Sequence, residues 1–381
     1  MTKGALRIAM LGHKRVPSRE GGIEIVVEEL GARMCQRGNH VVCYNRRGNH
    51  VSGKKYNEQE LKHWKGMELK QVFTIDRAGV AAVTASISAT LRAAFGRYDV
   101  VHFHACGSCI LMWLPRLLGK RCICTIHGLD HLRKKWQNSF GKYYIRFSEW
   151  VAVRFANEMI VLNESEQKYF QERYGRRTIW IPNGVSRKER RAPKHILNSF
   201  GLEKDGYILF LGRIVPEKGI EYLIDAFRRL HTDKKLVIAG GSSDSFVYFR
   251  QLKIHASCDE NILFTDFVQG EMLDELYSNA YVYVLPSDLE GMPLSLLEAM
   301  SYGNCCVVSD IPGCAEIVGD HGLLFERGNV RALQGLLQRL CDHPEIVQKY
   351  REASSDYVVN RFSWEDVTDR TLAVYRGEEQ A

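Results

Sequence analysis

Short apolar runs alternate along the chain with longer stretches whose apolar residues recur at helical spacing. The short runs predict buried strands, because apolar residues there follow one another without a polar alternate. Strands that alternate with helices predict a parallel sheet, and hence an α/β fold, in each half of the chain. The predicted strands are Leu6–Leu11, His40–Tyr44, Asp99–His104, Cys122–Ile126, Ile160–Leu162, Thr178–Ile181, Ile208–Leu211, Leu236–Ala239, Ile262–Phe264, Tyr281–Leu285 and Cys306–Ser309.

The chain of 381 residues is too long for one ordinary core and predicts two domains. We place the first at residues 1–190 and the second at 205–362. The segment 186–206 is charged, contains Pro193 and Gly201, and is expected to connect the two.

Composition and charge narrow the class of protein. Hydrophobic residues make up 45% and charged residues 25%, as in soluble globular proteins, and no charge-free run is long enough to cross a bilayer. The N-terminus lacks a secretory signal, and the eleven cysteines form no disulfide framework, which favours a reducing cytosol. Residues 1–190 carry 33 Lys and Arg against 16 Asp and Glu, whereas residues 191–381 carry 19 against 29. This asymmetry indicates that the first half faces nucleic acid or an anionic membrane, or that it has a solvated basic surface without a partner.

The first strand is followed by a glycine pair that opens a helix. Gly21 and Gly22 precede a predicted helix at Ile23–Gln36, and a helix N-terminus in this position can hold phosphate. The G-x-G-x-x-G pattern is missing, which excludes the usual nicotinamide or flavin fingerprint. A glycine pair is also common in turns that bind nothing.

Histidines follow two of the predicted strands. His127 comes directly after Cys122–Ile126, at the end of a parallel strand where α/β sheets bind ligands, although it can equally be a capping or supporting residue. His102, His104, Cys106 and Cys109 superficially resemble a zinc cluster, but no second pair of ligands follows. Strand alternation sends both histidines to one face and Phe103 to the other, so metal binding is disfavoured.

The segment from Leu132 to Phe155 mixes cations with aromatic residues. Such a mixture suits the headgroup zone of an anionic leaflet, and it also suits single-stranded nucleic acid. The third interpretation is an ordinary amphipathic helix, with Phe147, Val151 and Phe155 in the core and the cations in solvent. These alternatives stay open at this point.

Two loops in the second half carry the strongest candidate chemistry. Arg213 and Lys218 lie in a loop between a strand and a helix, where a guanidinium and an ammonium can clamp a diphosphate. Glu290 lies in a second such loop, and Pro293 suits the first turn of a helix that contains Glu298. The N–H groups of Gly291, Met292 and Leu294 are expected to point out of that helix start.

These residues form motifs that resemble a known family. Gly212-Arg-x4-Lys218-Gly and Glu290-Gly-x-Pro-Leu-x3-Glu298-Ala-Met-x2-Gly are similar to those of the family 4 retaining glycosyltransferases of the GT-B fold. Further matching patterns occur at Ile181–Val185, Gly313–Val318 and Phe362–Glu365, so the resemblance covers nearly the whole chain. The stretch Pro17–Glu24 resembles a subgroup that contains bacterial rhamnosyltransferases, although Glu20 stands where that subgroup has tyrosine.

The resemblance implies two facing Rossmann-like domains with parallel sheets and a sugar-nucleotide donor in the cleft between them. It implies that the last helix, from about Trp364 to Tyr375, crosses back, so that residues 363–381 join the first domain. The family pattern assigns the donor diphosphate to Arg213 and Lys218, the ribose to Glu298, and the donor sugar to Glu290. The rest of the implied site comprises the backbone of Gly291, Met292, Pro293 and Leu294, together with Gly22 beside the phosphates and His127 beside the reacting sugar.

The implied activity is a metal-independent, retaining transfer of a hexose or deoxyhexose, with rhamnose among the candidates. No Asp-x-Asp motif occurs, and no metal or cofactor is expected besides the donor itself. The expected acceptor is a lipid-linked or oligosaccharide glycan of bacterial cell-surface polysaccharide synthesis. An anionic membrane is then the expected partner of the basic first half rather than nucleic acid, with the protein cytoplasmic and peripheral on the inner face of the plasma membrane.

Two other classes of function remain as alternatives. A nucleotide-sugar 2-epimerase uses the same fold without an acceptor, and would convert the donor alone. A non-catalytic membrane-binding or nucleic-acid-binding protein would have the same fold without the catalytic residues. The presence of Arg213, Lys218, Glu290 and Glu298 argues against this alternative.

Overall fold

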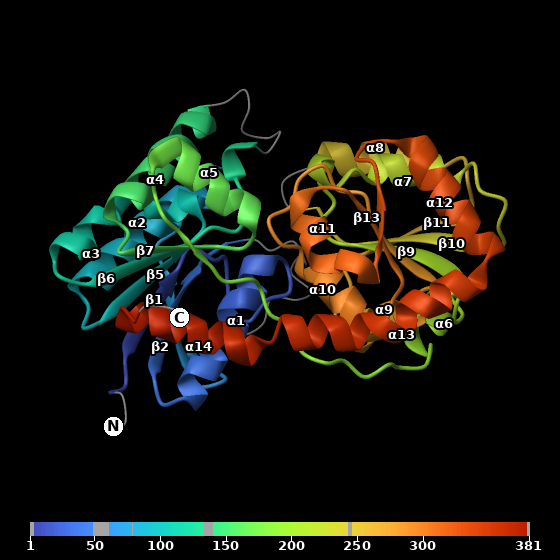
Figure 1. The fold of residues 1–381 in the computed structure, drawn as a ribbon. Helices are drawn as coiled ribbons and strands as arrows, with labels where there is room; N and C mark the ends of the chain where they lie inside the picture. The colour runs from blue at the N-terminus through green and yellow to red at the C-terminus, as the bar shows by residue number, and fades with distance from the viewer. Residues whose placement is uncertain (1–3, 49–60, 78, 133–139, 243–245, 379–381) are drawn as a thin grey trace. The chain divides into compact units, whose positions relative to one another are not determined.

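The computed structural model describes the chain except for residues 1–3, 49–60, 78, 133–139, 243–245 and 379–381 (Figure 1). It divides the chain into two compact units, Met1–Asn183 with Trp364–Ala381, and Gly184–Ser363. Each unit is an α/β structure built on one mainly parallel sheet, as the alternation of strands and helices predicts. Seven residues of the predicted basic, aromatic segment, at 133–139, lie outside the described residues.

The sheet of the first unit has the order β3-β4-β2-β1-β5-β6-β7-β8. All neighbouring strands are parallel except β3 and β4, and the pairing of Met10 with His102 sets the register between β1 and β5. The central strands are almost wholly buried, which explains why their sequences are continuous apolar runs. The strands are β1 (Arg7–Leu11), β2 (His40–Arg46), β3 (His63–Trp64), β4 (Met67–Val72), β5 (Val100–His104), β6 (Arg121–Thr125), β7 (Glu158–Val161) and β8 (Ile179–Trp180).

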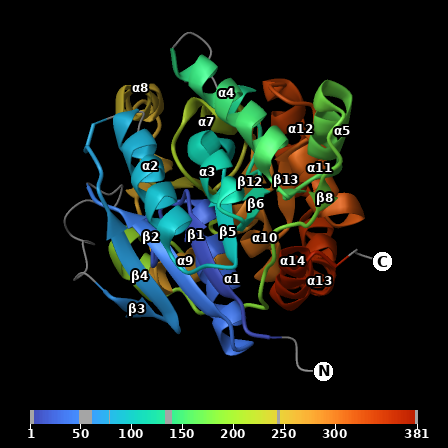
Figure 2. The ribbon, with the colours of Figure 1, turned by 90° about the vertical axis from the view of Figure 1, so that its left-hand side faces the viewer.

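Helices cover both faces of this sheet, and Figure 2 shows α2, α3 and α4 over one face of it. The helices are α1 (Gly22–Gln36), α2 (Val80–Phe95), α3 (Trp113–Leu117), α4 (Phe140–Phe155), α5 (Glu164–Tyr174) and α14 (Trp364–Arg376), with 3-10 turns η2 (Cys106–Leu111) and η3 (Asp130–Leu132). Helix α14 packs against α1, where Glu365 accepts hydrogen bonds from Arg33 at 2.8 Å and from Arg37 at 2.7 Å. The last helix therefore belongs to the first unit, as expected.

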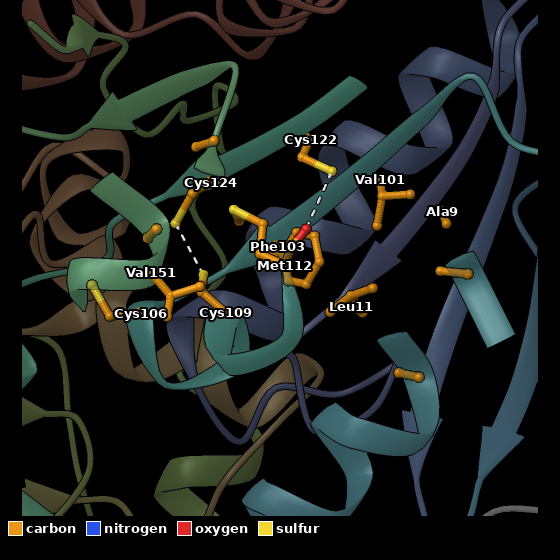
Figure 3. Close-up of a cluster of buried hydrophobic side chains, with 14 of the residues drawn as sticks. Ala9, Leu11, Val101, Phe103, Cys106, Cys109, Met112, Cys122, Cys124 and Val151 are labelled. Carbon is orange, nitrogen blue, oxygen red and sulfur yellow. Dashed lines mark hydrogen bonds between the residues drawn. The ribbon is translucent and has the colours of Figure 1, made fainter. Parts of the chain in front are cut away.

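A buried cluster between the sheet and α2, η2 and α4 forms the core of the first unit (Figure 3). Phe103 and Val101 of β5 point into it together with Met112. Its cysteines are free thiols, and the sulfur atoms of Cys109 and Cys124 lie 3.4 Å apart. These cysteines therefore act as small apolar core residues.

The second unit has a six-stranded, fully parallel sheet with the order β11-β10-β9-β12-β13-β14. Its strands are β9 (Tyr207–Leu211), β10 (Lys235–Ala239), β11 (Ile262–Asp266), β12 (Val282–Leu285), β13 (Cys306–Ser309) and β14 (Leu323–Phe325). Its helices are α6 (His195–Phe200), α7 (Ile220–Phe227), α8 (Phe246–Ala256), α9 (Glu271–Asn279), α10 (Leu294–Ser301), α11 (Pro312–Val318), α12 (Val330–Asp342) and α13 (Pro344–Arg361), with 3-10 turns η5 (Pro216–Lys218) and η6 (Gly319–His321).

The segment 186–206, expected as a connection, belongs to the second unit and contains helix α6. The first N–H groups of this helix are satisfied from a distant part of the chain. One carboxylate oxygen of Glu275 accepts hydrogen bonds from the backbone N–H groups of Lys194, His195 and Ile196 at 2.7 to 3.0 Å. This cap explains how a charged segment without a capping residue of its own forms an ordered helix.

Strands β3, β4 and β14 were not predicted. Strand β4 has the sequence MELKQV, whose alternating buried and partly exposed residues differ from the continuous apolar runs of the central strands. It lies toward the edge of the sheet, next to the antiparallel β3, where one side of a strand can remain polar. Strand β14 has only three residues, which is too short for a pattern to be visible.

In both sheets the strand order reverses between two central neighbours. The reversal lies between β1 and β5 in the first sheet and between β9 and β12 in the second. Loops at the carboxyl ends of such strand pairs diverge, and open α/β sheets bind ligands there. Among the helices that the structure describes, none has the length and apolar character required to span a membrane.

Candidate functional site

The loops that follow β9 and β12 lie together at the reversal point of the second sheet. The first contains Arg213 and Lys218, and the second contains Glu290. The backbone N–H of Asp288 donates to the carbonyl of Glu217 at 2.9 Å and joins the two loops. Parallel strands that are neighbours therefore bring together residues that are more than seventy positions apart.

A buried ion pair occupies the junction of these loops. Nζ of Lys218 donates to Oε1 of Glu290 at 2.5 Å, and Oγ of Ser287 donates to the same oxygen at 2.6 Å. The side chains of Lys218 and Glu290 are only 10% and 12% exposed. A pair so shielded from water interacts more strongly than a surface pair, and the additional hydroxyl fixes the carboxylate.

Two glycines allow the backbone to approach this pair closely. Gly219 has φ +58°, and a Cβ there would lie 2.2 Å from the carbonyl oxygen of Pro286. A Cβ on Gly313, in the first turn of α11, would lie 2.5 Å from the carbonyl oxygens of Glu290 and Gly291. The Glu290 loop is thus held between the loop after β9 and helix α11.

Helix α10 starts directly after the Glu290 loop. Pro293 is its N-cap residue rather than part of its first turn, and Leu294 is its first residue. The N–H of Leu294 therefore has no preceding carbonyl within the helix to bond. Glu298 is the fifth residue of α10 and is half-buried, with its carboxylate 3.4 Å from the hydroxyl of Tyr277.

The remaining predicted residues of this unit lie in the same two loops. Arg213 is half-buried in the loop after β9, whereas Gly291 and Met292 are buried between Glu290 and the start of α10. The structure thus gathers all the donor-site residues predicted for the second half at one edge of one sheet. The hydroxyl contact of Ser287 with Glu290 was not predicted from the sequence.

The reversal point of the first sheet carries Gly22 and a group of histidines. Gly21 caps helix α1 without a side-chain hydrogen bond, and Gly22 is the first residue of that helix. Glu24, in the first turn, accepts a hydrogen bond from the backbone N–H of Lys14 at 2.7 Å. This contact ties the loop after β1 to the start of α1, so Gly22 stands in a fixed position.

His127 follows β6 and contacts a buried histidine of β5. Its Nε2 lies 3.1 Å from Nδ1 of His104, and the rings are nearly parallel. The ring of His104 also contacts that of His102, with the centroids 4.1 Å apart and the planes inclined by 34°. The prediction that His102 and His104 share one face, opposite Phe103, is confirmed.

Burial keeps His102, His104 and His13 neutral. It lowers the pKa of His102 to about 3, with His127 adding to the effect. It also holds the pKa of His104 well below its ordinary value, together with the neighbouring histidines His102, His127 and His13. For His13, in the loop after β1, burial lowers the pKa to about 4 even though Glu24 and Asn45 oppose the shift. These imidazoles can exchange hydrogen bonds without carrying charge.

The histidines and cysteines that superficially suggested zinc have other contacts. Nδ1 of His102 lies 2.5 Å from the hydroxyl of Tyr375, and Nε2 lies 2.7 Å from that of Thr125. Cys109 points into the apolar core. Within the residues that the structure describes, no group of three or more His, Cys, Asp and Glu is placed to hold a metal ion.

The sequence missed the contact of His104 and the partner of His102. From the sequence, His104 was considered only as a possible zinc ligand, whereas its pairing with Thr125 places it beside the end of β6. Tyr375 lies 273 positions from His102, and nothing in the local pattern of α14 indicates its partner. Gly22 and His127 belong to the first unit and the Lys218–Glu290 pair to the second.

Comparisons with known proteins extend over both units. The family described as "Glycosyl transferases group 1" matches residues 194–357, and "Glycosyltransferase Family 4" matches residues 20–189. The chain is 25% identical to the alpha-maltose-1-phosphate synthase of Mycobacterium tuberculosis, over 97% of this chain and 99% of that protein. It is 31% identical to the O-antigen chain mannosyltransferase B of Escherichia coli, over 48% of each.

A solved structure supports the fold. HepE of Anabaena, in complex with UDP-glucose, superposes with a TM-score of 0.80 at 16% identity, covering 98% of this chain and 100% of that one. At this level of identity the likeness concerns the fold. The predicted GT-B fold class is thereby confirmed.

Proposed function

Because the chain is a glycosyltransferase, with a first half of glycosyltransferase family 4 and a second half of the glycosyl transferases group 1, we propose that it uses a nucleotide-diphosphate sugar. It transfers a hexose or deoxyhexose to a glycan acceptor, with retention and without a metal ion. The observation that carries this proposal is the buried contact between Lys218 and Glu290 at the reversal point of the second sheet. The UDP-glucose complex of Anabaena HepE supports the class of donor.

Lys218 can serve the diphosphate without losing its contact with Glu290. An ammonium has three N–H donors, and one of them is used by Glu290, which leaves two for phosphate oxygens. Arg213 adds a planar fork suited to a second phosphate oxygen. Each charge-assisted contact is worth about 1.5 to 3 kcal/mol when it is shielded from water.

The reaction then proceeds on one face of the donor sugar. The acceptor oxygen bonds to the anomeric carbon while the bond from that carbon to the phosphate oxygen breaks. The proton of the acceptor hydroxyl passes to the departing phosphate oxygen, so the protein need not supply a base. Positive side chains at the diphosphate stabilise the charge that develops on the leaving group, and Glu290 orients the sugar instead of forming a covalent bond.

The other predicted residues take supporting roles in this proposal. Glu298 accepts hydrogen bonds from the nucleotide ribose, and the N–H groups of Gly291, Met292 and Leu294 bind sugar hydroxyls or phosphate. Pro293 fixes the path of the chain between them. Gly22 offers its backbone to the donor phosphates, and His127 offers an imidazole to the reacting sugar.

A screen of donors tests this proposal. The protein is heated with a panel of UDP-, GDP-, dTDP- and ADP-sugars in the presence of EDTA, and unfolding is followed by fluorescence. A donor held at a hundred times its Kd adds about 2.7 kcal/mol to the free energy of unfolding, and should raise Tm by several degrees. The selected donor is then incubated with acceptors and the anomer of the product is determined by NMR. Inversion, a requirement for metal, or the absence of any binding donor contradicts the proposal, and epimerisation without acceptor supports the 2-epimerase instead.

We further propose that the first unit docks on an anionic membrane that carries a lipid-linked acceptor. Helices α2, α3 and α4 expose large apolar side chains, and they carry no exposed acidic residue within their described lengths. We call this the α2–α4 surface; it comprises the apolar residues Leu91, Phe95, Trp113, Leu117, Phe147 and Trp150 and the cations Arg92, Arg116, Arg146 and Arg154.

Charge complementarity favours a membrane as the occupant of the α2–α4 surface. From residue 77 to residue 157 the chain has twelve Lys and Arg residues and three acidic ones. One of the acids, Glu149, is buried and accepts hydrogen bonds from Tyr169 and Tyr174, so it does not offset the surface charge. Cations around exposed aromatic residues bind the headgroup zone of an anionic leaflet at about 1 kcal/mol per cation.

Co-sedimentation with vesicles tests the membrane proposal. Binding is expected to vesicles of phosphatidylcholine with 30% phosphatidylglycerol, and it should weaken at high salt and without the anionic lipid. The variant Leu117→Ser with Arg146→Glu should lose binding, whereas Phe246→Ser, an equally exposed residue of the second unit, should keep it. Equal binding of both variants contradicts the proposal, as does salt-dependent RNA binding without vesicle binding.

The choice of donor sugar to test first is based on the sequence of the loop between β1 and α1. Its resemblance to the rhamnosyltransferase subgroup makes dTDP-rhamnose the first deoxyhexose donor to test, followed by glucose, galactose and N-acetylglucosamine donors. We place the reaction in bacterial cell-surface polysaccharide synthesis, at the cytoplasmic face of the plasma membrane, where nucleotide sugars and lipid-linked acceptors meet.

A further inference from the structure

We propose that His104 is a positioning residue for His127: its Nδ1–H donates to Nε2 of His127 and thereby holds the proton of His127 on Nδ1. The consequence for catalysis rests on the proposed function, but the position of the proton does not. His127 then contributes a hydrogen-bond donor, and not an acceptor, from its remaining nitrogen. No charge on either ring is required.

The ring of His104 is held from several sides. It is fully buried, with the tilted ring of His102 at a centroid distance of 4.1 Å and the nearly parallel ring of His127 at 5.4 Å. The backbone of Gly12 also passes close to the carbonyl of His104, since a Cβ at Gly12 would lie 2.2 Å from that oxygen. The rings of His102 and His127 therefore limit rotation of the His104 ring, and Gly12 leaves its backbone little room to shift.

The neighbouring ring of His102 is itself held by hydrogen bonds. Both ring nitrogens of His102 have hydroxyl partners, Tyr375 of α14 and Thr125 of β6. Rotating this ring would break both hydrogen bonds and is therefore unfavourable. A chain of contacts therefore runs from Tyr375 of α14 through the rings of His102 and His104 to His127.

Proton counting decides the direction of the hydrogen bond. His104 is neutral and carries one N–H, on either Nδ1 or Nε2. Its Nε2 is buried and has no hydrogen-bond partner among the described residues. If His127 donated to Nδ1, the proton of His104 would sit on Nε2 as a buried N–H without an acceptor. Such orphaned N–H groups are rare in proteins, so the proton belongs on Nδ1, where it reaches His127.

The position of the proton is directly measurable. Protein labelled with ¹⁵N-histidine gives ring-nitrogen shifts that separate the two tautomers, and the signals of His127 are identified by their loss in His127→Gln. The wild type should show His127 with a protonated Nδ1 and a bare Nε2. In His104→Leu this preference should disappear. In His104→Asn it should be retained, because the asparagine amide can replace the Nδ1–H donor.

Kinetics give the second readout. With the donor selected by the screen, His104→Leu should lower kcat about 10-fold while the donor KM changes less than about twofold. His104→Asn should restore kcat to within about threefold of the wild type, and a loss that came only from disturbed packing would not be repaired in this way. Circular dichroism and thermal unfolding check that both variants are folded.

The outcomes separate this inference from the proposed function. A protonated Nε2 on His127 in the wild type overturns the inference, as does a tautomer that is unchanged in His104→Leu. If no nucleotide sugar is a substrate, the proposed function fails while the tautomer measurement still stands. Equal loss of kcat in His104→Leu and His104→Asn, with the tautomer retained in the latter, also contradicts a positioning role.

Discussion

The two units place their candidate residues at equivalent points of two sheets and fill those points with opposite chemistry. In each sheet the site follows the two central strands where the strand order reverses, β1 and β5 in one and β9 and β12 in the other. The first site contains buried neutral imidazoles, whereas the second contains a buried ammonium and carboxylate. The fold therefore determines where a ligand can bind, and the side chains determine what it can be.

The difference follows from how each site offsets the cost of burial. A buried charge is tolerated when an opposite charge and further hydrogen bonds accompany it, as Glu290 and Ser287 accompany Lys218. Burial lowers the pKa of His102 and of His104, because a charged imidazolium would be poorly solvated there, and these two rings therefore stay neutral. The second site is thus suited to stabilise charge, and the first is suited to orient a substrate through hydrogen bonds.

The largest expected effect comes from removing the cation of the charged site. Lys218→Ala should lower kcat/KM for the donor about 10³-fold, or about 4 kcal/mol, because the leaving diphosphate loses its buried counter-charge. Steady-state kinetics with the selected donor measure this. Lys204→Ala removes an exposed lysine of the same unit and should behave as the wild type. A Lys218→Ala variant within about tenfold of the wild type would place the diphosphate elsewhere.

Neutralising the carboxylate of the same pair should have the next largest effect. Glu290→Gln keeps the shape of the side chain but leaves the ammonium of Lys218 buried without its counter-charge. We expect kcat to fall about 100-fold while donor binding, measured by calorimetry, changes little. The control is Glu271→Gln, on an exposed face of helix α9. Equal losses in the two variants would show that the effect is not specific to the site.

The buried neutral histidines of the first unit should make the free energy of unfolding depend on pH in the acid range. Since the pKa of His13 and of His102 is lowered from 6.5 to about 4 and about 3, the unfolded chain binds more protons than the folded chain below pH 6.5. The contribution of these histidines to the free energy of unfolding is therefore fully present above pH 6.5 and decreases as the pH falls. Each histidine lowers the free energy of unfolding by up to about 1.4 kcal/mol per pH unit.

Urea unfolding between pH 7 and pH 5 measures this slope. The substitution His102→Asn should reduce this slope by the contribution of one histidine, which is about 1.4 kcal/mol per pH unit. His231→Gln, which changes an exposed histidine of the second unit, should leave it unaltered. A slope that is insensitive to His102 would show that its ring is protonated in the folded protein.

The smallest expected effect concerns the hydroxyl that joins α14 to the histidines. Tyr375→Phe removes the partner of Nδ1 of His102 and should lower the free energy of unfolding by about 1 kcal/mol. Tyr143→Phe, at an exposed position of α4, should change it by less than about 0.5 kcal/mol. Chemical denaturation compares the two. If Tyr375→Phe is neutral, water or a rotated ring replaces the hydroxyl.

The sequence predicted the elements of both sites better than their contacts. The apolar runs identified the central strands, and the strand order then explains why the loops of Lys218 and Glu290 meet. Alternation on β5 correctly separated His102 and His104 from Phe103. The roles of the candidate residues toward a donor stay predictions, since they depend on a ligand.

What the sequence could not supply were contacts between distant, locally ordinary residues. Glu275 has no feature that marks it as the cap of α6, some eighty positions earlier. Tyr375 is one of several apolar residues along α14, and only packing selects it as the partner of His102. Such contacts follow from the geometry of the whole unit, which helical or strand periodicity does not contain.

The return of α14 to the first unit has a consequence for biosynthesis. Strands β1 to β8 leave the ribosome before all of residues 184–363, and Tyr375 follows only after them. During this interval Nδ1 of His102 has no tyrosine hydroxyl to bond, and the guanidinium of Arg121 has no carbonyl of Val374. The unit whose synthesis begins first is therefore completed last, after all of the second unit has been made.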